Sequence, residues 1–139
     1  MTSLMNPKNF LMVGGAVLLI VGLAGFAGII GPTPDQSIFG PSWYFDNAEN
    51  WAHTILGIVA LIAAFAIPAG MQGGLTLAVG VVALIVGLWG FVLPHMTPNF
   101  FDANLENPAD DILHLAVGAW AILSWRGAKK MMGGGGMPM

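Results

Sequence analysis

Four apolar stretches without a single charged side chain dominate this sequence, at residues 10–30, 51–67, 75–93 and 112–125. A hydrocarbon core about 30 Å thick takes roughly 20 residues of α-helix. The first and third stretches meet that length unaided. A soluble amphipathic helix would place charges along its polar face, and none of these stretches does so. The sequence therefore predicts an all-α integral membrane protein with four transmembrane helices.

The second and fourth stretches are shorter, and each is preceded by residues that can start a helix earlier. Asn107 has the character of an N-cap, Pro108 of a first helical residue, and Asp110 of an acid in the first turn. Residues 47–50, which include Glu49, offer the same chemistry before the second stretch. The turn between the second and third stretches is predicted at residues 69–74.

The composition excludes several classes of protein. Only 8% of the 139 residues are charged and 56% are hydrophobic, whereas soluble domains carry about 25% charged residues. Four Lys plus Arg residues are too few for a nucleic-acid footprint. The chain has no cysteine, which excludes disulfides, thiolate metal sites and a cysteine nucleophile. The partner that this composition requires is the lipid bilayer.

The few charges predict an orientation. Lys8 precedes the first span, and the other three bases follow the last one, at Arg126, Lys129 and Lys130. Basic residues near span ends stay in the cytoplasm, so both termini and the short middle turn are expected there, in a multi-pass plasma-membrane protein. All seven acids fall in the two long connections or at the helix starts that follow them: Asp35, Asp46, Glu49, Asp102, Glu106, Asp110 and Asp111.

The chain contains an internal duplication. Residues 21–26 recur as 86–91, and residues 50–57 match 111–118. Each unit is a predicted hairpin that returns to its starting side, so the units are parallel repeats rather than the inverted repeats of many transporters. We predict one transmembrane domain over residues 1–130, with repeats at about 10–68 and 75–126. A flexible Met- and Gly-rich tail is expected over residues 131–139.

Small residues recur at matched places in the two repeats. Helices in lipid associate largely by close backbone approach, which small residues allow. Six glycines are predicted to pack helices in this way: Gly22, Gly25, Gly57, Gly87, Gly90 and Gly118.

These motifs resemble a known family. Its pattern is present at residues 22–26, at 50–53 with Gly57, at 87–91, and at 107–114 with Gly118. The chain is similar, from about residue 10 to residue 125, to short four-helix prokaryotic membrane proteins classed as domain of unknown function 4383. The resemblance implies a plasma-membrane location and the topology above, and it implies no activity.

The candidate site is a duplicated histidine stripe. His53 lies three residues after Asn50, and His114 lies three residues after Asp111, so each pair is predicted to share a helix face. Each histidine is expected about one turn inside the outer membrane interface. The other histidine, His95, is expected in an interfacial loop at the end of the third span.

Three interpretations of the paired histidines stay open. In the first, the rings bond carbonyls of adjacent helices or loops and, with Asn50 and Asp111, clamp the outer loops. In the second, His53 and His114 are axial ligands of a haem or belong to a metal site. In the third, they are proton-sensitive groups, as in a small-solute transporter. No arginine lies on the outer side to bind haem propionates, which argues against haem. Helix capping accounts for Glu49 and Asp110, so no metal ligand is assigned.

Catalysis finds little support in the sequence. No serine has a histidine and an acid at nucleophile spacing, and no phosphate-binding loop is present. The expected function is therefore that of a non-catalytic structural or accessory protein. Its expected partners are a second copy of itself or other membrane proteins.

Overall fold

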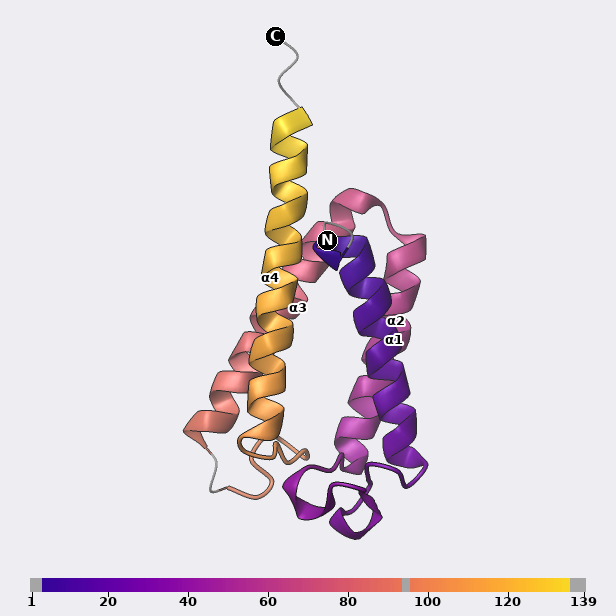
Figure 1. Cartoon of the computed structure of the whole chain (residues 1–139), viewed down its shortest axis with the longest axis vertical. Helices are drawn as coiled ribbons and strands as arrows, with labels where there is room; N and C mark the ends of the chain where they lie inside the picture. The colour runs from indigo at the N-terminus through magenta and orange to yellow at the C-terminus, as the bar shows by residue number, and fades with distance from the viewer. Residues whose placement is uncertain (1–3, 94–95, 136–139) are drawn as a thin grey trace.

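The computed structural model describes residues 4–93 and 96–135, and these residues are helical apart from their connections. Within the described residues, β-type backbone pairing is limited to two isolated β-bridges. Two short 3-10 helices, η2 (Pro34–Gln36) and η3 (Gly40–Ser42), lie in the connection after the first helix. The four main helices, drawn in Figure 1, are α1 (Pro7–Phe26), α2 (Asn47–Ala66), α3 (Ala69–Val92) and α4 (Ala109–Gly135).

Three helices, α1, α2 and α3, are long and apolar enough to cross a membrane. Helix α4 is longer, but it carries Asp110 and Asp111 in its first turn and Arg126, Lys129 and Lys130 in its C-terminal half. These charges restrict its apolar part to residues 112–125. The structure therefore supports a helical membrane protein with three helices that could cross the bilayer.

The helices form two hairpins. Helix α1 packs along α2, and α3 packs along α4, whereas contact between the hairpins is limited mainly to α1 with α3 and α4. In Figure 1 the start of α1, the α2–α3 turn and the C-terminal part of α4 lie at one end of the molecule. The two long connections, α1–α2 and α3–α4, lie together at the other end.

Glycines bring the two helices of each hairpin into contact. A Cβ atom on Gly25 would overlap the side chain of Asn50, and one on Gly90 would overlap the side chain of Asp111. A Cβ atom on Gly57 would meet the backbone of α1 at Leu19. The helices are therefore too close at these points for any larger residue, which is the kind of packing that the sequence predicted.

Several helix ends differ from the prediction. Helix α1 begins at Pro7, where the Asn6 side chain accepts a hydrogen bond from the Asn9 amide, and it ends at Phe26 rather than at residue 30. Gly28 then takes a positive φ of 78°, which glycine adopts without steric cost and which turns the chain away. Helix α2 begins with a capping box between Asp46 and Glu49.

The predicted turn at residues 69–74 is wrong, because α3 already begins at Ala69 and the turn is confined to Ile67 and Pro68. The Gln72 side chain donates hydrogen bonds to the carbonyls of Ala63, Ala64 and Ile67. The Ala63 carbonyl also accepts from the Ile67 amide, so the bonds to Ala64 and Ile67 are the ones that satisfy carbonyl groups left without a helical partner at this helix end. A polar side chain of α3 makes the tight turn possible.

The start and end of α4 also differ. The predicted N-cap role of Asn107 is wrong, because its side-chain amide donates to Asp111 and the helix begins at Ala109. The tail expected from residue 131 is helical as far as Gly135. Residues 136–139 of that tail, and His95, lie outside the described residues.

Candidate functional site

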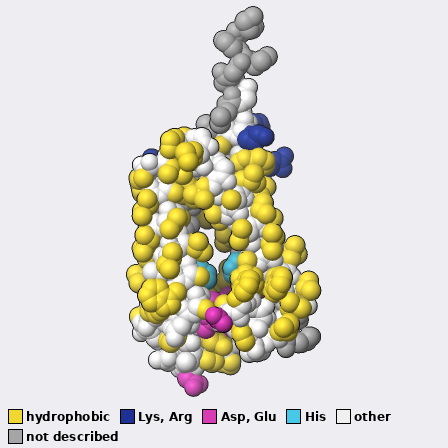
Figure 2. Space-filling model, turned by 180° about the vertical axis from the view of Figure 1, so that it is seen from behind, with side chains coloured by type: hydrophobic (Ala, Val, Ile, Leu, Met, Phe, Trp, Pro, Cys, Tyr) yellow, Lys and Arg dark blue, Asp and Glu magenta, His cyan; other side chains and the backbone are white. Residues whose placement is uncertain are grey.

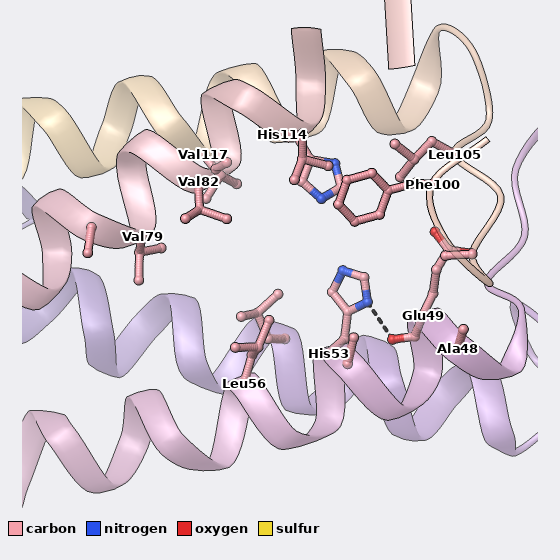
Figure 3. Close-up of a pocket in the computed structure, with 16 residues that line it drawn as sticks. Ala48, Glu49, His53, Leu56, Val79, Val82, Phe100, Leu105, His114 and Val117 are labelled. Carbon is pink, nitrogen blue, oxygen red and sulfur yellow. Dashed lines mark hydrogen bonds between the residues drawn. The ribbon is translucent and has the colours of Figure 1, made fainter. Parts of the chain in front are cut away.

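A cavity of about 430 Å³ lies between the two hairpins. Its walls are mostly Ala, Val and Leu side chains of α2 and α3, among them Leu56, Val79 and Val82. His53, His114 and Glu49 are the polar residues that line it, and Figure 3 shows them toward the same end. Ligand sites are typically apolar cavities of about 300–1,000 Å³ with a few polar groups, and this cavity has that character.

The two histidines face each other across the cavity. Their ring centroids are 6.4 Å apart, and the ring planes are inclined by 55°. His53 Nδ1 lies 2.7 Å from the carbonyl oxygen of Glu49, and His114 Nδ1 lies 2.7 Å from that of Asp110. A carbonyl oxygen can only accept, so each Nδ1 carries a proton, and in the neutral ring Nε2 keeps a lone pair. Figure 3 shows these second nitrogens directed into the cavity and toward each other.

The loop clamp predicted from the histidine stripe is not built as expected. Each ring bonds a carbonyl of its own helix rather than of a neighbour. Asn50 is fully buried against Gly25 of α1, and Asp111 packs against Gly90 of α3. Each residue turns an α-helix by about 100°, so side chains three positions apart, such as Asn50 and His53, point in directions that differ by roughly 60°. That angle is enough to turn Asn50 into the hairpin and His53 toward the cavity.

Aromatic residues from the connections hold the histidines in place. Phe45, which is buried, stacks on the His53 ring with a centroid separation of 4.8 Å and an interplanar angle of 16°. Trp43 packs edge-on against Phe45. On the other side of the cavity, Phe100 lies beside His114 (Figure 3). The histidine rings are therefore positioned by residues of both connections.

Three buried acids lie at the same end of the molecule as the histidines. Glu49, Glu106 and Asp110 each offer one oxygen, and these oxygens lie within 4.8 Å of one another. Figure 2 shows acidic side chains directly below the two histidines and the Lys and Arg side chains at the opposite end of the molecule. Glu106 is buried, although it lies in the long connection before α4 rather than in a helix.

Two hydrogen bonds join the hairpins at this end. Trp43 Nε1 donates to Asp110 Oδ1 over 2.6 Å, and the Asn104 amide donates to Asp46 Oδ2 over 2.7 Å. In each case a residue of the α1–α2 connection meets a residue of the second hairpin. The acids therefore help to close the end of the molecule where contact between the helices themselves is sparse.

The electrostatics of the cluster are dominated by burial. Desolvation, followed by a hydrogen bond to the Asp110 side chain, raises the pKa of Glu106 from its ordinary 4.5 to about 8. Tyr44 beside the cluster also has a raised pKa, through burial and then through the charges of Glu106, Asp46 and Glu49. A signal for the cluster was present in the sequence, since both connections carry acids and neither carries a base.

No family model, curated protein or solved structure matches this chain. The resemblance to domain of unknown function 4383 therefore stays a prediction from the quoted motifs. The site must be interpreted from its own geometry.

Proposed function

We propose that this chain is a small non-catalytic protein of the plasma membrane that crosses the bilayer four times with both termini in the cytoplasm. Three apolar helices and the separation of bases from acids along the molecule support this topology. The proposed arrangement is two tandem parallel repeats. Its support is that matched residues make matched contacts, Gly25 with Asn50 and Gly90 with Asp111.

The proposed activity is the binding of a lipid-like amphiphile, a molecule with an apolar body and a hydrogen-bonding end group. The observation that carries this proposal is the position of His53 and His114 at the polar end of an otherwise apolar cavity. Apolar walls favour an apolar ligand body, and convergent polar groups fix one end of it. Apolar walls also argue against a path for small polar solutes.

The end group that fits is a hydrogen-bond donor. Both histidines present an Nε2 lone pair when neutral, and the rings are 6.4 Å apart, so an amino group can donate one hydrogen to each ring, whereas a hydroxyl can donate its one hydrogen to either ring. The apolar body would lie along Val79 and Val82 of α3. Figure 2 shows the histidines from outside, between the hairpins, which supports entry from the side through the bilayer.

The test is to purify the full chain in mild detergent and to identify co-purified amphiphiles by mass spectrometry. Ala78 lines the cavity and is exposed, so Ala78→Phe fills the space without displacing the core. Val81 is 45% exposed on the same helix and does not line the cavity, so Val81→Phe is the matched control. Loss of the bound amphiphile in Ala78→Phe alone is the expected result, and its retention there would contradict the proposal.

A second candidate is a haem or metal centre held by the same histidines. The supporting observation is that each Nδ1 bonds a backbone carbonyl, the arrangement that orients metal-ligating histidines. No arginine lines the cavity to bind haem propionates. An absorption spectrum of the purified protein separates the candidates. A Soret band that disappears in His53→Ala or His114→Ala would favour haem over the amphiphile.

We also propose an accessory role in which the protein self-associates or joins a larger membrane assembly. Apolar side chains cover the outside of the hairpins, with Ile20, Ile62 and Phe65 each more than half exposed. Such surfaces meet either lipid or other helices in a bilayer. Cross-linking in native membranes and the particle size in mild detergent test this role, and a monomer in both would contradict it.

A further inference from the structure

We propose that Glu49, Glu106 and Asp110 form a binding site for a hard divalent cation, with calcium as the best match. The site adjoins the proposed amphiphile site, since Glu49 also lines that cavity, but it uses carboxylates at the closed end of the molecule rather than the histidine rings. One oxygen of each residue lies within 4.8 Å of the other two. The three residues come from α2, the α3–α4 connection and α4.

The three acids of the cluster are deeply buried. The three side chains are only 3%, 7% and 2% exposed, respectively. Within the described part of the chain, Glu49 Oε1 and Glu106 Oε2 are buried and accept no hydrogen bond from an N–H or O–H donor. Figure 3 shows the Glu49 side chain directed toward the α3–α4 connection, which carries Glu106. A buried carboxylate oxygen without a partner is costly, and a cation between the two hairpins would compensate both oxygens.

The other carboxylate oxygens of the cluster are already held in place by hydrogen bonds. Glu49 Oε2 accepts from the Asp46 amide, and Glu106 Oε1 accepts from the Asn104 side chain. Asp110 accepts from Trp43 and from the Glu106 amide. Each Asp110 oxygen still has a free lone pair for a cation. Hydrogen bonds to the other oxygens orient carboxylate ligands and raise the affinity of metal sites.

The cluster also has no Lys or Arg beside it. The four Lys and Arg residues of the chain lie toward the other end of the molecule, so none of them is available to neutralise the cluster. A set of oxygen ligands favours calcium, magnesium or manganese over zinc or copper. Calcium bonds oxygen at about 2.3–2.6 Å, so it can join oxygens up to roughly 5 Å apart, whereas magnesium at about 2.0–2.1 Å requires a tighter set.

Terbium luminescence provides a direct test on the full chain in detergent. Tb³⁺ replaces Ca²⁺ in oxygen sites and emits when a nearby tryptophan is excited. Trp43 Nε1 lies 2.6 Å from Asp110 Oδ1, so its indole is an adjacent donor. The expected result is a saturable emission that excess Ca²⁺ displaces more effectively than Mg²⁺. Emission without saturation, or without displacement by Ca²⁺, would overturn the proposal.

Variants locate the ion. Glu49→Gln keeps the capping box, because glutamine also serves at that position, and Glu106→Gln keeps the acceptor for Asn104. Each should weaken terbium binding by about tenfold or more. The matched controls Asp35→Asn and Asp102→Asn remove exposed acids of the same connections and should bind as the wild type does. Equal effects of controls and cluster variants would refute the site.

Trp43→Phe is the complementary variant. It should remove most of the sensitised emission while Ca²⁺ still raises the unfolding temperature. Unchanged emission would place the ion away from Asp110 and contradict the proposal. Circular dichroism verifies that each variant is helical. Should a glutamine variant unfold, the wild-type competition and Trp43→Phe still decide the question.

Discussion

Trp43 donates its indole N–H to the Asp110 carboxylate over 2.6 Å, and this bond ties the α1–α2 connection to the first turn of α4. The helices of the two hairpins make few contacts with each other. The relative position of the hairpins at the end that holds the histidines and the buried acids therefore depends on polar links of this kind.

Trp43→Phe tests this link. It leaves Asp110 Oδ1 buried without its donor, and hydrogen bonds to charged groups contribute about 1.5–3 kcal/mol. We expect the free energy of unfolding to fall by about that amount in denaturant titrations of the detergent-solubilised protein. Trp51 is 60% exposed, so Trp51→Phe should change it by less than about 0.5 kcal/mol. Equal effects at both positions would show that the link is not stabilising.

Gly25→Ala and Gly90→Ala test the packing within the hairpins. The new Cβ atoms would overlap Asn50 and Asp111, so the helices must separate. We expect losses of about 1–3 kcal/mol in unfolding free energy. Gly73 of α3 has open space at its Cβ position, so Gly73→Ala should be neutral or slightly stabilising. A similar loss in all three variants would indicate that helix separation is not the cause.

The raised pKa of Glu106 predicts that the stability of the protein depends on pH. Its pKa rises from 4.5 in the unfolded chain to about 8 in the folded protein, through burial and then the Asp110 hydrogen bond. The folded state therefore binds the proton more tightly, and stability falls as the pH rises through that window. Thermal unfolding without divalent cations should show this fall, and Glu106→Gln should flatten it. A wild-type curve that rises toward pH 8 would contradict the assignment.

His53→Ala separates ligand binding from folding. The hydrogen bond of the ring is made within its own helix, so its removal should leave the helical content unchanged. We expect loss of the bound amphiphile, measured by mass spectrometry of the purified protein. His114→Ala should behave in the same way, because its ring is bonded identically. Unfolding of either variant would show that the ring is needed for folding and would contradict this expectation.

Several features could be predicted from the sequence for local reasons. Charge-free stretches identify apolar helices because lipid and protein interiors exclude unpaired charge. The capping role of Glu49 was also predictable, since Asp46 and Glu49 have the spacing of a capping box. The predicted cap at Asn107 failed because its side chain bonds Asp111 instead. A cap requires the side-chain oxygen of Asn107 to accept from a backbone amide, and whether the side chain is placed for that depends on three-dimensional position.

The candidate site needed the tertiary structure. Glu49 and Glu106 lie far apart in the sequence. The acids of the two connections indicated a shared acidic end of the molecule, but they did not indicate that these two residues meet. Periodicity placed Asn50 and His53 on one face, yet packing turned Asn50 toward Gly25 and left His53 facing His114.

The sequence by itself determined that this protein has apolar helices, closely packed at glycines, with bases and acids toward opposite ends. These properties follow from the solvation of individual residues and from helical periodicity, both of which are local. Only the tertiary structure decided that the histidines face each other across a cavity and that Glu106 joins Glu49 and Asp110 in a buried cluster. Both depend on how the two connections fold between the hairpins, where hydrogen bonds between distant residues select one arrangement.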